Sequence, residues 1–411
     1  MSSLDYEKIK GISKEYGDAF YLLDEEALSI NYSELHKAFS SIYPKMNIAY
    51  SYKTNYTPFI CKKINEFGGY AEVVSDMEYE LAKTVGVKAN KIIFNGPYKN
   101  KTAFEELLLS GGFVNLDSQR DFEILKEIQI KYAQKSLNIG IRCNFDVEDE
   151  VVSRFGIDID SPLFHEIIDF VKNNKNIKLR NLQCHFANRA LKYWKNRAPK
   201  VFAIITKCDL QDILQIDLGG GLYGKMPPSL QGQFNNPIPS YSDYANIVAT
   251  QFAEHYKDID DKLKPELIIE PGTAIVADVM KFAAKVIDIK KVREKNIATL
   301  LGSIYNINPT LNTKNPPIEV VHEKGNISES YMDLDFGGYT CIESDYLYRH
   351  YSGKLAVNDY VVFSNVGSYS VVLKPPFILP NFPIVAMTKN NQIELIKNQE
   401  KFDDIFHTFK F

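Results

Sequence analysis

Short apolar runs alternate with longer amphipathic stretches between about residues 47 and 272. The runs are rich in β-branched and aromatic residues, which is typical of strands buried in a parallel sheet. Several of them end in a charged or small polar residue, as "NIAYSYK" does. Eight such runs occur, at 47–53, 70–75, 92–96, 113–118, 138–144, 179–187, 213–220 and 266–272.

The stretches between the runs have helical spacing of apolar residues. In "SQRDFEILKEIQIKYAQK", the side chains expected on one buried face are Phe122, Leu125, Ile128 and Ile130. Alternating strands and helices predict parallel strands joined by crossover helices, and eight units that close on themselves make a (β/α)8 barrel. An open doubly wound sheet is the alternative. It is disfavoured because no G-x-G-x-x-G turn follows the first run.

The pattern changes after about residue 280. Segments such as "NIATLLGSIYNI", "YMDLDFGGY" and "YVVFSNVGSYSVV" are short strand-like runs separated by turns, which predicts an antiparallel β domain. The first ~35 residues are expected to add one strand to it before a helix enters the barrel. We therefore expect a barrel domain at 36–280 and a β domain built from 1–35 and 281–411.

Composition narrows the class of protein. The 411 residues are 45% hydrophobic and 24% charged, as in ordinary globular proteins, and a net charge of -4 gives no basic excess for nucleic acid or anionic membrane. No apolar run approaches the ~18 residues of a membrane span. The N-terminal segment has no hydrophobic signal core, so we expect a cytoplasmic protein. The five cysteines form no Cys-x-x-Cys pair, which argues against a disulfide framework or a metal site.

The carboxyl ends of the eight runs carry reactive and phosphate-binding residue types. In a (β/α)8 barrel these ends form the rim where active sites lie. Polar loop residues of no particular kind would be the ordinary outcome. A lysine, a histidine, an arginine, carboxylates and glycines together instead predict a cofactor site. These residues are Lys53, Glu72, Asn95, Asp117, Arg142, His185, Asp217, Gly219, Gly220, Gly221 and Glu270.

Pyridoxal 5′-phosphate (PLP) has needs that this set can meet. It requires a lysine for a Schiff base, as Lys53 could supply, and a carboxylate at its ring nitrogen, as Glu270 could supply. A glycine-rich turn such as 219–221 suits its phosphate, and His185 offers a flat partner for the ring. Each residue alone has an ordinary structural explanation, such as a surface lysine or a hydrogen-bonded histidine. Their combination favours PLP.

The order of these motifs resembles that of PLP-dependent decarboxylases with the alanine-racemase fold, the group of diaminopimelate, ornithine and arginine decarboxylases. "AYSYKTN" is similar to the family's lysine segment, and "YAEVVS" to its "GFDVVS", with Glu72 in place of aspartate. "RFGI", "QCHFAN", "DLGGG", "EPGT", "CIESD" and "GSY" follow in the family's order. The resemblance runs from about Ala19 to Ile384. It implies a PLP-binding barrel followed by a β domain.

The resemblance also implies residue roles. Lys53, Cys341, His185 and Glu270 would be catalytic. Cys341 and Asp345 would come from the other subunit of a head-to-tail homodimer, and Cys341 would donate a proton to Cα after decarboxylation through an external aldimine and a quinonoid. A buried structural thiol is the ordinary alternative for that cysteine. The cofactor-binding residues would be Lys53, Glu72, Arg142, His185, Asn188, Gly219, Gly220, Gly221, Glu270, Gly272, Thr273 and Tyr369.

The substrate-reading positions depart from the family's pattern. In the diaminopimelate decarboxylases an arginine follows "EPG", where this chain has Thr273, and their "RPALY" appears as "NPTLN", with Asn308 and Asn312. Their glutamate after the cysteine is Ile342, unless Glu343 takes its role. Unpaired polar groups in a buried site are unfavourable, so diaminopimelate is disfavoured. Ornithine and lysine are disfavoured too, because their distal amines need an acidic partner.

Arg189 begins a basic, aromatic insertion, "RALKYWKNR", near the expected rim. It could receive a carboxylate or phosphate group of the substrate, or belong to a solvated helix face. We expect a decarboxylase of a free, carrier-linked or conjugated amino acid in a specialised biosynthetic pathway. An amino-acid racemase or epimerase on the same fold, with Lys53 and Cys341 on opposite faces, is one alternative. A non-catalytic PLP-binding protein is the other.

Overall fold

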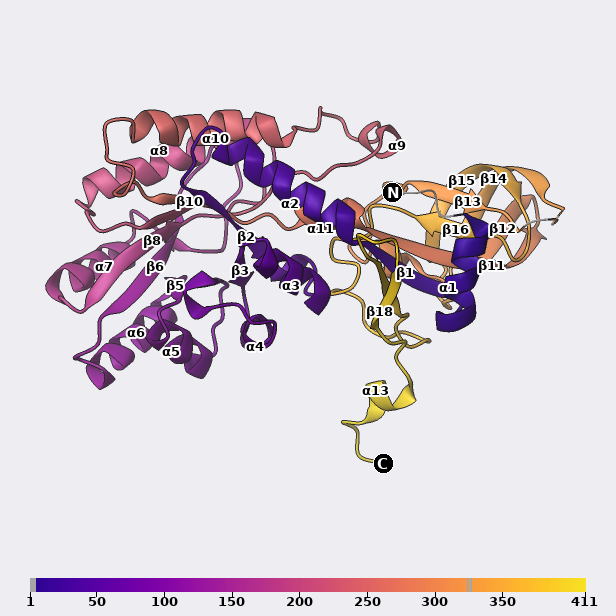
Figure 1. Cartoon of the computed structure of the whole chain (residues 1–411), viewed down its shortest axis with the longest axis horizontal. Helices are drawn as coiled ribbons and strands as arrows, with labels where there is room; N and C mark the ends of the chain where they lie inside the picture. The colour runs from indigo at the N-terminus through magenta and orange to yellow at the C-terminus, as the bar shows by residue number, and fades with distance from the viewer. Residues whose placement is uncertain (1–4, 324, 326) are drawn as a thin grey trace. The chain divides into compact units, whose positions relative to one another are not determined.

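The computed structural model describes residues 5–323, 325 and 327–411 (Figure 1). They form two compact units. The barrel unit comprises Asn31–Tyr223 and Pro239–Ala274, and the β unit comprises the other described residues, including Gly224–Ile238. The domain limits expected from the sequence stay a prediction. No helix in the described part of the chain has the length and apolar character needed to cross a membrane.

The barrel unit is a closed sheet of parallel strands. Each strand pairs in parallel with its neighbours, and closure comes from the β10–β2 and β5–β6 pairings. The closed barrel is therefore confirmed over the open sheet. The strands are β2 (Met46–Ser51), β3 (Tyr70–Val73), β4 (Ile92–Phe94), β5 (Phe113–Leu116), β6 (Leu137–Asn144), β8 (Ile177–Gln183), β9 (Gln215–Asp217) and β10 (Glu266–Ile269), with β7 (Ile157–Asp158) added beside β6.

Helices cover the outside of these strands (Figure 1). They are α2 (Glu25–Ser40), α3 (Pro58–Glu66), α4 (Asp76–Thr84), α5 (Lys101–Leu109), α6 (Gln119–Lys131), α7 (Pro162–Asn173), α8 (Leu191–Lys207) and α10 (Tyr241–His255). Several begin at a serine or asparagine whose side chain accepts a backbone N–H, as Ser118 does for α6. Ile130 of α6 is exposed, against expectation. Eight residues at about 100° each leave it about 80° away from Phe122 around the helix.

The β unit is a mostly antiparallel sheet in the order β15-β14-β12-β11-β1-β17-β18, with β16 on β11 and β13 on β16. Two pairings, β1–β17 and β12–β14, are parallel. Helix α1 (Tyr6–Tyr16) packs Ile9 and Ile12 onto the sheet. The strands are β1 (Ala19–Asp24), β11 (Met280–Val292), β12 (Lys295–Leu300), β13 (Ile318–Val321), β14 (Glu329–Gly337), β15 (Tyr346–Leu355), β16 (Tyr360–Phe363), β17 (Ile384–Met387) and β18 (Ile393–Lys397).

Two segments that resembled strands fold differently. Residues 304–307 form a helical turn, α12 (Ile304–Ile307), because Ser303 caps it. The run after β16 leaves the sheet at Phe363. There the Gly367 amide donates to the Ala277 carbonyl at 2.9 Å, and a Cβ at Gly367 would lie 1.8 Å from the Val276 oxygen. Short helical segments complete the chain: α9 (Pro228–Gln231), α11 (Thr273–Val276), α13 (Phe402–Phe406), η1 (Tyr52–Thr54), η2 (Ala89–Lys91) and η3 (Ala277–Val279).

Candidate active site

Lys53 lies just past the end of β2, in the short 3-10 turn η1. Its Nζ is 2.5 Å from the Glu72 carboxylate and 2.6 Å from the Ser51 hydroxyl. Ser51 and Glu72 are register partners on β2 and β3, so the parallel pairing itself brings the carboxylate beside the lysine. Burial opposes the ionisation of Glu72, but the Lys53 ammonium outweighs it and lowers the pKa of Glu72. The pair therefore stands as an ammonium and a carboxylate.

Glu270 lies directly after β10 and is buried. It accepts hydrogen bonds from Asn95 Nδ2 at 2.5 Å and from Gln183 Nε2 at 3.2 Å. Asn95 also donates to Glu72 at 3.1 Å, so one amide joins the two carboxylates. Burial, together with the Glu72 charge, raises the pKa of Glu270 to about 7. This carboxyl group can therefore hold or release a proton near neutral pH.

Asp217 ends β9 and is fully buried. Its Oδ1 accepts the amide of Gly219 at 2.9 Å. Burial, and then the charge of Glu270, raises the pKa of Asp217 well above its usual range. The Asp217 carboxyl group is therefore neutral beside Glu270.

His185 lies on the loop after β8. Its Nδ1 accepts the Gly220 amide at 2.9 Å, which places the ring proton on Nε2, and it lies 3.8 Å from Glu270. Burial, then the charges of Lys53 and Arg142, keeps the pKa of His185 well below its usual range. With 27% of its side chain exposed, His185 presents a neutral flat ring.

The glycine turn after β9 approaches its neighbours too closely for any side chain. A Cβ at Gly219 would lie 2.4 Å from the Cys184 oxygen, and one at Gly220 would lie 2.4 Å from the Glu270 oxygen. Gly219 and Gly221 also have positive φ, at 71° and 92°. The turn thus presents backbone rather than side chains, as a phosphate cradle does.

Two further predicted cofactor residues lie at the ends of β6 and β10. Arg142 is buried, and its guanidinium lies 3.2 Å from Asp117 of the neighbouring strand end. A Cβ at Gly272 would lie 1.9 Å from the Thr54 hydroxyl, so the loop before Thr273 lies against the turn that carries Lys53. Asn188 uses its side-chain oxygen within its own loop, where it accepts the Ala190 amide at 3.2 Å.

In the β unit, Cys341 is exposed on a turn that Asp345 organises. Asp345 is 4% exposed and accepts hydrogen bonds from the Ile304 amide at 2.7 Å and the Thr340 hydroxyl at 2.6 Å. Ile342 and Glu343 lie on the same turn. A substrate-binding role for Asp345 stays a prediction, and its contacts give it a structural role that the sequence did not indicate.

Asn308 and Asn312 hydrogen-bond to each other, one bond using the Asn312 main-chain carbonyl. Asn308 Nδ2 donates to the Asn312 carbonyl and Asn312 Nδ2 donates to Asn308 Oδ1, each at 2.8 Å. Tyr369 has φ 65°, which is uncommon for a bulky residue and is often found at functional sites. The buried Ser368 hydroxyl beside it has no partner among the described residues.

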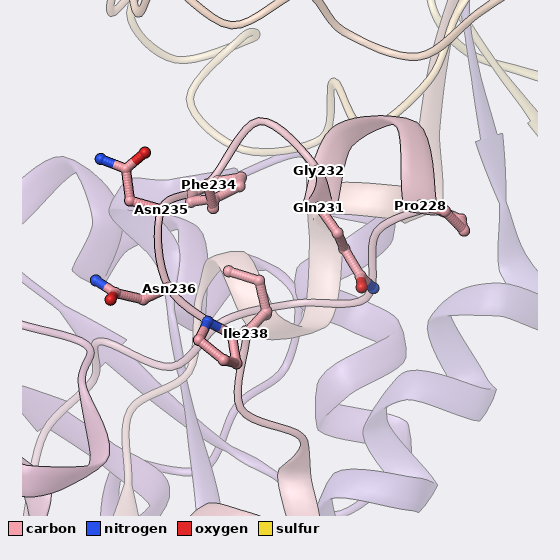
Figure 2. Close-up of a pocket in the computed structure, with 8 residues that line it drawn as sticks. Pro228, Gln231, Gly232, Phe234, Asn235, Asn236 and Ile238 are labelled. Atoms are coloured by element: carbon pink, nitrogen blue, oxygen red, sulfur yellow. The ribbon is translucent and has the colours of Figure 1, made fainter.

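A pocket of about 380 Å³ lies on the Gly224–Ile238 segment of the β unit (Figure 2). Glutamine, asparagine, proline, phenylalanine and isoleucine side chains line it. Because none of these titrates, the pocket lacks the acid–base groups found at the barrel rim. The lining residues include Pro228, Gln231, Phe234, Asn235, Asn236 and Ile238.

The structure thus brings together the predicted barrel residues Lys53, Glu72, His185, Glu270 and the 219–221 turn. The sequence did not indicate that Gln183 hydrogen-bonds to Glu270, or that Asn95 joins Glu72 to Glu270. Both are polar residues at strand ends, and that position was the available signal. A Schiff-base lysine, a carboxyl group titrating near neutrality, a neutral ring partner and a glycine cradle fit PLP.

Fold and site define a barrel enzyme that uses PLP. The family model "Pyridoxal-dependent decarboxylase, pyridoxal binding domain" matches residues 31–277, more than half of the chain. The protein belongs to this family of PLP-dependent amino-acid decarboxylases, as the sequence predicted.

Relatives match nearly the whole chain. Diaminopimelate decarboxylase of Aquifex aeolicus is 22% identical and covers 97% of this chain and 93% of its own. L-glutamyl-[BtrI acyl-carrier protein] decarboxylase of Niallia circulans is 23% identical, and the match covers 99% of this chain and 97% of that protein. The crystal structure of the Methanocaldococcus jannaschii diaminopimelate decarboxylase matches with a TM-score of 0.85 at 22% identity. The match covers 98% of this chain and 94% of that one. This likeness confirms the fold.

Proposed function

We propose that this decarboxylase acts on an amino acid or amino-acid derivative other than diaminopimelate. The observation that carries the proposal is the mutual hydrogen bonding of Asn308 and Asn312. Where the resembling enzymes have an arginine and a tyrosine, these two residues hydrogen-bond to each other, Asn308 through the Asn312 main-chain carbonyl, and carry no charge. Ile342 likewise gives no acidic partner for a distal amine. Binding diaminopimelate would leave its charged distal groups unpaired.

Bound PLP supplies the electron sink for the pair released when the bond from Cα to the carboxylate breaks. Lys53 would hold the cofactor covalently and yield to the substrate's amine. Glu270 would hold the proton at the ring nitrogen, and the neutral ring of His185 would lie against the cofactor. Glu72 would keep the released Lys53 protonated and positioned. Cys341 would return a proton to Cα as general acid.

The geometry of the Cys341 turn supports a shared site. Asp345 fixes this turn while Cys341 itself remains exposed. A fixed and exposed thiol suits a residue that a second copy contributes, which agrees with the head-to-tail homodimer implied by the resemblance. Tyr369, strained next to an unsatisfied Ser368 hydroxyl, is proposed to bind the cofactor phosphate.

Arg189 supports a substrate with a distal acidic or conjugated group. Its carbonyl accepts the Tyr244 hydroxyl at 2.7 Å, and its guanidinium lies 5.3 Å from the Tyr223 ring centre. Among the described residues it has no ion pair, so its charge is available to a carboxylate or phosphate. The Niallia circulans relative is named for a carrier-linked glutamyl substrate, which keeps carrier-linked amino acids among the candidates. A cytoplasmic location and a specialised pathway stay predictions.

The test is a substrate panel in D2O. It should include meso-diaminopimelate, L-ornithine and L-lysine, the D-amino acids, and amino acids bearing acidic or carrier-linked side chains. We expect CO2 release with one deuterium at Cα, and slower turnover of diaminopimelate than of an acidic or conjugated substrate. Efficient decarboxylation of diaminopimelate would overturn the proposal. Deuterium exchange without CO2 would point to a racemase, and neither product would point to a non-catalytic PLP protein.

The same panel, run on an Arg189 variant, tests whether this arginine binds the acidic group of the substrate. Arg189→Gln should raise KM for the acidic substrate about tenfold or more, because a charge-assisted hydrogen bond is lost. Lys192→Gln, an exposed residue three positions later on α8, serves as the matched control. An equal effect in both variants would argue against a role for Arg189 in substrate binding.

A further inference from the structure

Arg197, in the first half of α8, is completely buried although the sequence around it resembles a solvated helix face. Its guanidinium lies 3.8 Å from the Trp194 ring centre. It also lies 5.7 Å from the Phe186 ring centre, and its hydrogen bonds all go to backbone carbonyls. Its Nη1 donates to Leu218 at 2.8 Å and Gly220 at 2.9 Å, and its Nη2 donates to Phe186 at 2.9 Å and Asn188 at 3.4 Å.

These four carbonyls belong to two loops that follow β8 and β9. One loop carries His185 and the other is the glycine turn. The helix is bonded to the glycine turn a second time, since Trp194 Nε1 donates to the Gly221 carbonyl at 3.2 Å. Arg197 therefore joins the two loops on the side away from their free amides.

The direction of those amides follows from peptide geometry. In a trans peptide the C=O of one residue and the N–H of the next point in opposite directions. Because Arg197 holds the carbonyls of Phe186, Asn188 and Gly220, the next amides point away from it. These are the N–H groups of Ala187, Arg189 and Gly221, and none has an acceptor within the described part of the chain. A set of unsatisfied amides facing one way is an anion site.

The charge of Arg197 has no acidic counterpart. No carboxylate forms an ion pair with it in the portion of the chain that is described, although burial lowers its pKa only to about 10 and it stays protonated. A buried unpaired cation is unfavourable unless an anion compensates it. The acids Asp149 and Glu270 act on it electrostatically, but neither forms an ion pair with it.

We propose that Arg197 is a positioning residue that makes this cradle selective for a phosphate monoester dianion. It aligns the amides of 187, 189 and 221 from behind, and its charge favours the dianion across the peptide groups. The inference concerns the phosphate of PLP, the family's cofactor, and does not depend on which amino acid is the substrate. A merely structural clamp would instead affect all cofactor forms alike.

The test compares two cofactors that differ only in the phosphate. Apo-protein, with Arg197→Gln and Arg197→Lys variants, is titrated with PLP and with pyridoxal while the visible absorbance of the Lys53 adduct is followed. In Arg197→Gln the Kd for PLP should rise about 10- to 100-fold, because the amides lose their alignment and the positive charge behind them is removed, while the Kd for pyridoxal changes little. Arg197→Lys should fall between, because it keeps the charge but not the forked geometry.

Lys195→Gln, exposed on the same helix, is the matched control and should bind both forms as the wild type does. Inorganic phosphate should raise the unfolding temperature of wild-type apo-protein and not that of Arg197→Gln. Equal weakening of PLP and pyridoxal, or unchanged PLP affinity, would overturn the proposal. Should Arg197→Gln fail to fold, the same ratio measured in Arg197→Lys decides. Because no substrate is used, these outcomes are independent of the decarboxylation panel.

Discussion

The two units bury charge for different purposes. The buried lysine and arginine side chains of the described residues, Lys99, Arg142 and Arg197, all belong to the barrel unit. There they face carboxylates or loop carbonyls, as Lys99 faces Asp121 of α6 at 2.7 Å. The buried charged residues of the β unit are acids, namely Asp24, Glu25, Asp335, Asp345 and Asp359.

The acids of the β unit hold turns together. Asp359, for example, accepts the amides of Glu323 at 3.0 Å and Ala356 at 2.8 Å. A carboxylate used this way stabilises backbone that would otherwise leave N–H groups unpaired. In the barrel, by contrast, Glu72 and Glu270 share the donor Asn95 and interact electrostatically, so their proton affinities depend on each other. The buried carboxyl groups of the barrel unit thus affect one another's protonation, whereas those of the β unit hold backbone turns.

The largest effect should come from the barrel. Lys53→Ala should remove the visible absorption of the covalently bound cofactor and reduce decarboxylation to background, because the cofactor loses the amine proposed to hold it. Absorbance of the purified protein measures it. Lys62→Ala, exposed on α3, is the control and should keep the band. If Lys53→Ala retained the absorption band, the cofactor would not be held by Lys53, and the proposed barrel site would be wrong.

A second prediction asks whether the β unit adds to the chemistry at all. Cys341→Ala should lower the decarboxylation rate about 10²- to 10⁴-fold, as loss of a general acid does, while the cofactor band persists. Mixing it with Lys53→Ala should restore about a quarter of the wild-type activity. Half of the dimers would be mixed, and each of these would have one intact site. Failure to recover activity would contradict a site shared between subunits.

A third prediction concerns the electrostatics of the barrel. Burial, with the Glu72 charge adding to it, raises the pKa of Glu78 from 4.5 to about 7. The folded protein therefore holds a proton there that the unfolded chain has lost between these pH values, so stability falls as pH rises through that window. Glu78→Gln cannot ionise. It should be more stable than wild type by up to about 3 kcal/mol at pH about 8 and little different at pH about 5.

Urea unfolding at the two pH values measures this difference. Glu80→Gln, exposed on the same helix, is the control and should show no such pH dependence. If the difference in stability between Glu78→Gln and wild type were the same at both pH values, the pKa of Glu78 would not be raised in the folded protein.

The smallest effect on activity should come from a turn-holding acid. Asp359→Asn keeps one acceptor oxygen and loses the other, so the free energy of unfolding should fall by about 1–3 kcal/mol. The PLP affinity and the activity of the folded fraction should not change. Exposed Asp288→Asn is the control. If Asp359→Asn altered cofactor affinity, the buried acids of the β unit would contribute to cofactor binding as well as to stability.

The sequence predicted much of the site because strand ends are visible in it. Lys53, Glu72, Arg142 and Glu270 lie at or near the ends of apolar runs. Parallel pairing then places the ends of neighbouring strands beside each other. The sequence was less successful after β16 and after β12, where 364–373 and 304–307 have strand-like composition. There the close approach of Gly367 to Val276 and the Ser303 cap decide the backbone, and both are contacts that composition does not encode.

By itself the sequence determined the closed barrel and the family and proposed Lys53 as the PLP lysine, since periodicity and strand-end chemistry are local properties. Tertiary structure alone decided that Asn95 joins Glu72 to Glu270, that Asp345 folds the Cys341 turn, and that Arg197 is buried behind the glycine turn. Each depends on partners distant along the chain. An arginine in a polar helical stretch gives the same sequence pattern whether its guanidinium is hydrated or donates to buried carbonyls. The physical reason is that hydrogen-bond partners are fixed by packing rather than by spacing.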